Sequence, residues 1–314
     1  MKLIQKVLFI GLGASIAAAL ILLTSTLPSD TANKTENPPY AKQMPTADPY
    51  VQKVKMPKLP KGLHFAGEPV PEDDFQITER IDRELLSNCF RHSSTLYNLK
   101  KSGRYFPVIE PILKKYGVPD DFKYLAVAES DLYVDISSPA KAKGMWQFLA
   151  STAEAYGLEV NNEVDERCHV EKATEAACKF LLKAKENFGT WTLAAASYNM
   201  GGGRTRQRTR EQGVKSYYDL YLNKETTRYI PRILAVKTVM ANPERYGFSV
   251  DAEDLYAPMV YRTIAVNTAV ASWIDFAKKY GVTYRELKIY NPWIRSSKLT
   301  NRSRKTYEVR LPKQ

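Results

Sequence analysis

The chain has 314 residues, of which 44% are hydrophobic, enough to fill one core and support a second, small module. Lysine and arginine outnumber aspartate and glutamate by 46 to 34, and the net charge of +12 fits either anionic partners or a basic solvated surface. The three cysteines and three histidines are scattered without the spacing of a zinc site, so we expect neither a metal nor a cofactor.

The first 27 residues are typical of an export signal. Lys2 and Lys6 precede an uncharged run from Val7 to Leu23, which as a helix would span about 26 Å, slightly less than a bilayer core. The sequence is compatible with two alternatives, a cleaved signal peptide and a retained signal anchor. The basic residues before the run direct the rest of the chain outward, so we expect a periplasmic or envelope protein with an optional inner-membrane tether. Export also argues against nucleic acid as a partner.

Residues 28–74 are rich in proline, lysine, threonine and asparagine and have little periodic apolar content. This composition predicts an extended linker. From residue 75 to residue 250 the hydrophobic pattern has helical periodicity and predicts a mainly α domain. Helices are expected around Ile81–Leu86, from Pro119 onward through Ala126, and over Trp146–Tyr156, Ala173–Ala184, Trp191–Asn199 and Arg228–Met240.

Residues 255–314 have a different character. Strands are predicted at Val260–Val266 and Tyr307–Leu311, with two short helices between them that begin at the capping residues Ser272 and Thr283. The order strand, helix, helix, strand predicts a small α+β module. Trp273, Phe276 and Tyr280 recur at helical spacing, which favours a small core over a sugar-binding platform.

Glu129 is the main candidate for chemistry. It continues the apolar stripe of Phe122, Leu125 and Ala126 at the end of a nearly uncharged helix. A carboxyl group buried there is desolvated, which favours its protonated form, as a general acid acting on a sugar leaving group requires. The alternative is an exposed glutamate at a helix end.

Four short motifs occur in a fixed order in this part of the chain. They are Glu129-Ser130, Gly144-Met145-Trp146-Gln147, Ala196-Ser197-Tyr198-Asn199, and Glu225-Thr226-Thr227-Arg228-Tyr229. Together they resemble glycoside hydrolase family 23, the goose-lysozyme-like lytic transglycosylases, and most closely the membrane-bound lytic murein transglycosylase D group. The resemblance extends over about residues 65–248 and implies a lysozyme-like helical fold that acts on peptidoglycan strands.

The resemblance also implies roles for individual residues. Glu129 matches the family's sole catalytic acid/base. Positions matching substrate-binding or cleft residues are Ser130, Gly144, Met145, Gln147, Tyr198, Asn199 and Tyr229.

In the family's pattern, the serine helps to orient the glutamate and the substrate, and the glutamine side chain hydrogen-bonds a sugar N-acetyl group. The tyrosine corresponding to Tyr198 brings its hydroxyl near the carboxyl group, Asn199 contacts substrate, and Tyr229 lines the cleft. Other interpretations remain open at two places. Met145, with its neighbours Trp146 and Phe148, fits a cleft floor and core better than direct ligands, and Asn199 before three glycines also fits a helix C-cap.

The matched motifs supply a single carboxylate, whereas ordinary glycosidases use two. The resemblance therefore implies a non-hydrolytic reaction, in which the muramoyl C6 hydroxyl attacks C1 and leaves a 1,6-anhydro end. Asp131 and Asp135 lie close to Glu129 in the sequence, so a hydrolytic muramidase stays open, as does an inactive wall-binding protein.

Two features depart from the family pattern. Lys141 and Lys143 lie in the approach to Gly144, where the family has small or apolar residues, and they add positive charge beside the cleft. The C-terminal module resembles a LysM glycan-binding domain in its element order and in Tyr290-Asn291-Pro292. Its opening loop, residues 267–272, lacks the Gly-Asp-Thr-Leu type of sequence, so we expect the module to bind glycan weakly at most.

Overall fold

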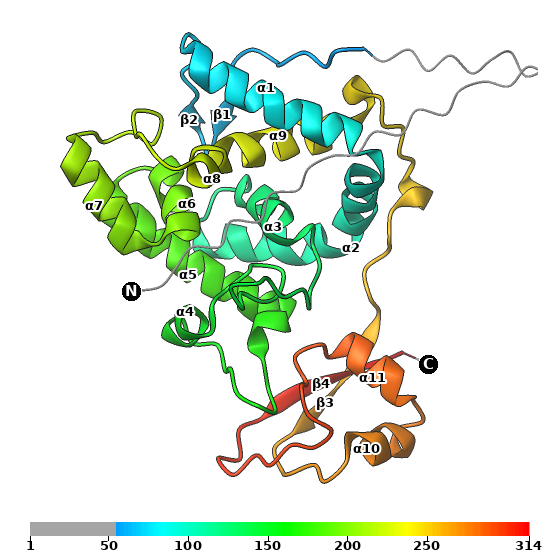
Figure 1. Cartoon of the computed structure of the whole chain (residues 1–314). Coiled ribbons are helices and arrows are strands. Elements are labelled where there is room, and N and C mark those ends of the chain that lie inside the picture. The colour runs from blue at the N-terminus through cyan, green and yellow to red at the C-terminus, as the bar shows by residue number, and fades with distance from the viewer. Residues whose placement is uncertain (1–54, 314) are drawn as a thin grey trace, which may run out of the picture. The chain divides into compact units, whose positions relative to one another are not determined.

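The computed structural model describes residues 55–313 and shows a mainly helical domain followed by a small α+β module (Figure 1). The predicted export signal and residues 28–54 of the predicted linker lie outside the described residues. Within the described part of the chain, no helix is both long enough and apolar enough to cross a membrane.

The helical domain (residues 55–250) is built from nine α-helices in its described part. They are α1 Phe75–Phe90, α2 His92–Tyr116, α3 Phe122–Ser130, α4 Ala150–Ala155, α5 Val170–Phe188, α6 Trp191–Met200, α7 Gly202–Gln212, α8 Lys224–Thr227 and α9 Tyr229–Ala241. Helix α9 packs against α1 and α3, and α5 packs against α2 and α6. The helical fold class expected from the sequence is confirmed.

Helices α3 and α9 lie in the core because almost every position along them is apolar. Phe122 and Leu125 of α3 and Ile233 and Leu234 of α9 are fully buried in one cluster. Helix α3 ends where Asp131 takes a left-handed conformation at φ 49° and hydrogen-bonds back to the helix. This abrupt end places Glu129 in the last turn of a buried helix.

Two sequence predictions are corrected by the structure. The helix expected over Trp146–Tyr156 is limited to α4, Ala150–Ala155, because residues 144–148 form a tight loop that Lys143 and Phe148 close by backbone pairing. The linker predicted for residues 28–74 ends before its expected boundary. Strands β1 (His64–Phe65) and β2 (Glu68–Pro69) form a small hairpin, and Phe65 is fully buried against Phe122.

The C-terminal module (residues 255–313) has the predicted element order. Strands β3 (Tyr261–Val266) and β4 (Tyr307–Pro312) pair antiparallel, and α10 (Trp273–Lys279) and α11 (Tyr284–Tyr290) lie between them in sequence. The hydroxyls of Ser272 and Thr283 cap the two helices as expected. Trp273 is fully buried and Phe276 and Tyr280 are half-buried against the module's core, as the periodicity indicated.

The module's core is completed by the helical domain. Val164 and Cys168, from the segment before α5, belong to the same apolar cluster as Trp273 and Ile294 of the module. Backbone hydrogen bonds join Asp165 N to the carbonyl of Trp293 at 2.8 Å and Arg295 N to that of Glu163 at 2.9 Å. These contacts make residues 159–168, which we call the shared segment, part of both cores.

Polar contacts strengthen the same junction. Lys305 lies 2.6 Å from a carboxylate oxygen of Glu159, and the Tyr307 hydroxyl donates to the same carboxylate at 3.0 Å. The Thr300 backbone N–H and hydroxyl both donate to Glu163. The module is therefore attached by apolar burial and by charged hydrogen bonds together.

Candidate active site

Glu129 accepts a hydrogen bond from the hydroxyl of Tyr229, the first residue of α9. Burial raises the pKa of Glu129 to about 7, although the Tyr229 hydrogen bond and the charge of Arg232 both act to lower it. The charge of Glu225 adds to the increase. A carboxyl group with this pKa exchanges a proton readily near neutral pH, which suits a group that must act first as an acid and then as a base.

Tyr198 lies at the end of α6, near enough for the charge of Glu129 to raise the pKa of its buried phenol further. Its hydroxyl donates to the backbone carbonyl of Trp146 at 2.6 Å. Its ring packs against Phe148 and Phe180, at centroid distances of 5.5 and 4.9 Å. Tyr229, which was expected only to line the cleft, therefore makes the direct hydrogen bond to Glu129, and Tyr198 supports the neighbouring loop.

That loop, residues 144–148, requires an unusual backbone. Gly144 has φ 82°, and a Cβ atom there would lie 2.0 Å from the carbonyl oxygen of Arg167, so only glycine fits. Gln147 also has a positive φ, 47°, and its side-chain amide donates to the carbonyl of Gly144 at 2.7 Å. The glutamine expected to bind an N-acetyl group thus hydrogen-bonds its own loop in this structure.

The interior side of the loop forms a floor. Met145 and Trp146 are buried, and the indole N–H of Trp146 donates to Thr174 of α5 at 2.9 Å. Phe148 is also buried. The interpretation of these three side chains as floor and core, and not as direct ligands, agrees with their burial.

Arg167 fixes the loop from the side of the shared segment. Its guanidinium makes two hydrogen bonds of 2.8 Å to Asp165 and donates to the carbonyls of Phe148 at 3.0 Å and Lys141 at 3.1 Å. Arg167 and Asp165 are both buried. Sequence reasoning missed this pair; the only local signal was an aspartate and an arginine two positions apart beside the apolar Val164.

Ser130 and Asn199 are placed differently from each other. Ser130 is buried, and its hydroxyl donates to the carbonyl of Ala126 one turn earlier in α3, not to Glu129. Asn199 is half-buried in the last turn of α6. Gly201 caps that helix through its backbone N–H, so the interpretation of Asn199 as the C-cap is wrong and its side chain is left for another role.

The two aspartates considered as second carboxylates face elsewhere. The Asp131 carboxylate accepts a 2.7 Å hydrogen bond from Asn98, and the buried Lys101 donates to its backbone carbonyl. Asp135 is exposed and lines a cavity to which Glu129 does not contribute. The thiols of Cys168 and Cys178 are both free and buried.

The helical domain and its module match two family models. Residues 107–220 match the transglycosylase SLT domain, and residues 262–314 match the soluble lytic transglycosylase C-terminal LysM-like domain. The chain therefore contains a transglycosylase SLT domain followed by a LysM-like domain, and the family resemblance seen in its motifs is confirmed.

A curated relative agrees with this assignment. Over 235 residues the chain is 29% identical to membrane-bound lytic murein transglycosylase D of Escherichia coli strain K12, covering 73% of this chain and 50% of that protein. A shorter match, 30% identical over 108 residues, is to a putative tributyltin chloride resistance protein of an Alteromonas species, covering 33% of this chain and 52% of the relative. The chain thus spans about half the length of the curated relatives it matches.

Solved structures of two larger enzymes align with 49% of the chain. They are an inactive mutant of the lytic transglycosylase Slt of Pseudomonas aeruginosa, 19% identical with a TM-score of 0.37, and the 70 kDa soluble lytic transglycosylase of Escherichia coli, 18% identical with a TM-score of 0.39. The alignments cover 26% and 27% of those chains.

Proposed function

We propose that this protein is a peptidoglycan lytic transglycosylase that cleaves the β-1,4 bond between N-acetylmuramic acid and N-acetylglucosamine without water. The observation that carries the proposal is the Glu129 carboxyl group, at the end of a buried helix, with a pKa raised to about 7 and a hydrogen bond from Tyr229. The family match supports the substrate class.

A single carboxyl group suffices if the substrate supplies the nucleophile. Protonated Glu129 gives its proton to the bridging oxygen, and the resulting carboxylate then takes a proton from the C6 hydroxyl of the muramoyl residue. That oxygen closes on C1 and leaves a 1,6-anhydro end. Because the hydroxyl belongs to the same sugar, its effective concentration replaces a second enzyme carboxylate.

The surrounding residues take supporting roles in this proposal. Tyr229 holds the carboxyl group in place, and Gly144, Met145 and Gln147 form one wall that Tyr198 and Arg167 keep in position. Gln147 reaches an N-acetyl group by exchanging its bond to the Gly144 carbonyl for one to substrate. Asn199, with no capping role, and Ser130, beside the acid, complete the proposed substrate contacts.

The test is product analysis in heavy-oxygen water. Purified peptidoglycan is digested, and the new ends are identified by mass spectrometry. We expect products one water lighter than hydrolytic fragments and free of the label. Label at C1 would instead make the protein a muramidase.

A matched variant separates absence of catalysis from failure to fold. Glu129→Gln keeps the size and polarity of the side chain but removes the proton, so release of muropeptides should fall by about 10²–10⁴-fold while the protein stays folded at the assay temperature. A loss of less than about tenfold would remove Glu129 from the mechanism. A parent protein that releases no muropeptides would instead favour the interpretation of the domain as an inactive wall-binding protein.

We further infer that the protein works in the cell envelope, in contact with peptidoglycan. The relative named membrane-bound lytic murein transglycosylase D and the predicted export signal support this location. Cell fractionation with an antibody to the module would distinguish a cleaved signal peptide, which gives a soluble periplasmic form, from a retained anchor in the inner membrane.

A further inference from the structure

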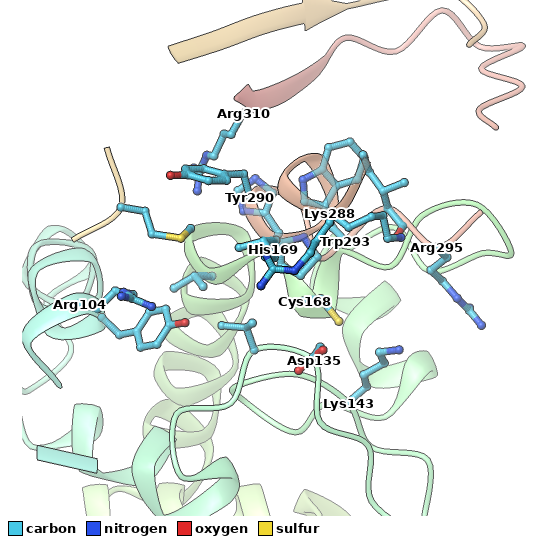
Figure 2. A pocket seen from close by; sticks show the side chains of 18 of the residues that line it. Arg104, Asp135, Lys143, Cys168, His169, Lys288, Tyr290, Trp293, Arg295 and Arg310 are labelled. Carbon is cyan, nitrogen blue, oxygen red and sulfur yellow. The ribbon is translucent and has the colours of Figure 1, made fainter. Parts of the chain in front are cut away.

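A cavity of about 690 Å³ lies between the module and the helical domain (Figure 2). One side is formed by α11 and the residues that follow it. The other is formed by α2, by Val134, Asp135 and Lys143 in the loop after α3, and by the start of α5. Glu129 does not line this cavity, so it is distinct from the proposed active site.

The ionisable lining of the cavity is strongly biased toward positive charge. Six basic side chains line it against one carboxylate, Asp135. The six are Arg104, Lys143, Arg285, Lys288, Arg295 and Arg310. Only Arg310 has a carboxylate partner within salt-bridge distance in the described part of the chain, namely Glu171 at 2.8 Å.

Two of these basic side chains come from opposite domains. Lys143 belongs to the loop of the helical domain, and Lys288 belongs to α11 of the module. Burial lowers the pKa of Lys288, and the charge of Lys143 lowers it further, as expected for neighbouring ammonium groups. An anion placed between them would relieve this repulsion.

The remaining lining is largely aromatic and aliphatic, including Tyr105, Tyr284, Ile289 and Trp293. Cationic groups set among such side chains suit a ligand that carries carboxylates on a partly apolar chain, as a peptide does. A compact inorganic anion would leave most of this volume unused.

We propose that the cavity binds the acidic stem peptides of peptidoglycan. This rests on the proposed function, because the glycan of the substrate is uncharged and its peptides carry the carboxylates that the basic side chains would recognise. The position of the cavity adds a consequence. Lys143 is adjacent to Gly144, so a peptide held there contacts the loop that also forms one wall of the proposed active site.

The proposal is tested by calorimetric titration of the full chain with a soluble stem tetrapeptide that has free carboxylates. The cavity variant is Lys143→Gln with Arg285→Gln, which removes one positive charge from each side of the cavity. The matched control is Lys278→Gln with Lys279→Gln, which removes two charges from exposed positions on α10, outside the cavity.

We expect the cavity variant to bind the peptide about tenfold more weakly or worse, and the control to match the parent. The same peptide with amidated carboxylates should bind the parent weakly. Equal affinities of parent and cavity variant would overturn the proposal, as would equal binding of the amidated peptide. Competition by inorganic phosphate at similar concentration would also overturn it, by showing a general anion pocket.

A second readout separates this proposal from the proposed function. The ratio of turnover on intact sacculi to turnover on glycan strands stripped of peptides should fall in the cavity variant and stay constant in the control. If the parent cleaves neither substrate but still binds the peptide, the proposed function fails and the cavity assignment stands. If it cleaves both at an equal rate and the variant does not change the ratio, the cavity assignment fails alone.

Discussion

The hydroxyl of Tyr229 donates a hydrogen bond to Oε1 of Glu129, although 100 residues of chain separate the two. The bond forms because α3 and α9 pack directly against each other. Tyr198, the other tyrosine near the carboxyl group, instead donates to the carbonyl of Trp146. One tyrosine thus acts on the proton of Glu129 and the other on the loop beside it.

Replacing Tyr229 should change the pH dependence of activity. The Tyr229→Phe variant loses a bond that stabilises the ionised carboxylate, so the pKa of Glu129 rises. Activity, which needs the protonated acid, should then persist to higher pH, with the alkaline limb displaced upward by about one unit. The measurement is the rate of muropeptide release from pH 5 to 9.

Tyr198→Phe is the matched control, because it removes one hydroxyl from the same site. Since its hydroxyl supports the Trp146 carbonyl, we expect a raised KM with the alkaline limb unmoved. A displaced limb in Tyr198→Phe, combined with an unmoved limb in Tyr229→Phe, would reverse the roles assigned to the two tyrosines.

The raised pKa of Glu129 also predicts how stability depends on pH. In the folded protein the pKa is about 7, above the ordinary value of 4.5, so between these pH values the native state binds the proton more tightly than the unfolded chain. This contribution to stability is present below pH 4.5 and is lost as pH rises through 7. The Glu129→Gln variant lacks this titrating group. Its melting temperature should therefore rise relative to that of the parent as the pH increases from 4.5 to 8. Glu79→Gln, an exposed change on α1, should show no such trend.

Alanine substitutions at Gly144 and Gly157 allow the cost of backbone strain to be measured separately from the cost of steric overlap. Both have positive φ, 82° and 92°, but a Cβ at Gly157 meets nothing within 4 Å, whereas one at Gly144 meets the Arg167 carbonyl. Gly157→Ala should cost about 1–2 kcal/mol. Gly144→Ala should cost at least about 2 kcal/mol more, because the loop and the shared segment must separate. If denaturant melts gave the same loss of unfolding free energy for both variants, the loop would be able to move away from Arg167 without cost.

Removing the module should uncover Cys168. This thiol is 1% exposed in the common core of module and helical domain, and burial raises its pKa to about 12. Deleting residues 259–314 should lower the melting temperature and speed the reaction of Cys168 with a thiol reagent. Cys178 and Cys89, buried elsewhere in the helical domain, should stay protected. An unreactive Cys168 in the shortened chain would mean that docking does not protect it.

Helices defined by local signals were predictable from the sequence. Helix α5 contains the predicted stretch Ala173–Ala184, and α6 begins at Trp191 as predicted. Helix α2 was not predicted, because Pro107 and Pro111 lie inside it and proline usually interrupts a helix. Residues 146–148 of the loop were wrongly predicted as the start of a helix, because the shape of the loop depends on Arg167, which is distant in sequence.

The candidate site was predictable in part for the same reason. The periodicity that put Glu129 at the end of an apolar helix is local, and the structure places this residue, half-buried, in the last turn of α3. The choice between Tyr198 and Tyr229 as its hydrogen-bond partner depends on how α3, α6 and α9 pack, which no local pattern encodes. The side chains of Gln147 and Ser130 likewise point to backbone carbonyls, of Gly144 and Ala126, to which they donate hydrogen bonds. No local sequence pattern indicated these bonds.

The shared segment sets the boundary at which this protein can be recombined with its relatives. Val164 and Cys168 fill the module's core, while Arg167, one residue earlier than Cys168, fastens the loop at Phe148. In a chimera joined at the start of the module, the foreign module would pack poorly against Val164 and Cys168. The resulting displacement of the shared segment would also displace Arg167 and the loop that it holds. The natural unit of exchange is therefore discontinuous: the module together with residues 159–168, which lie about a hundred residues before it in the chain.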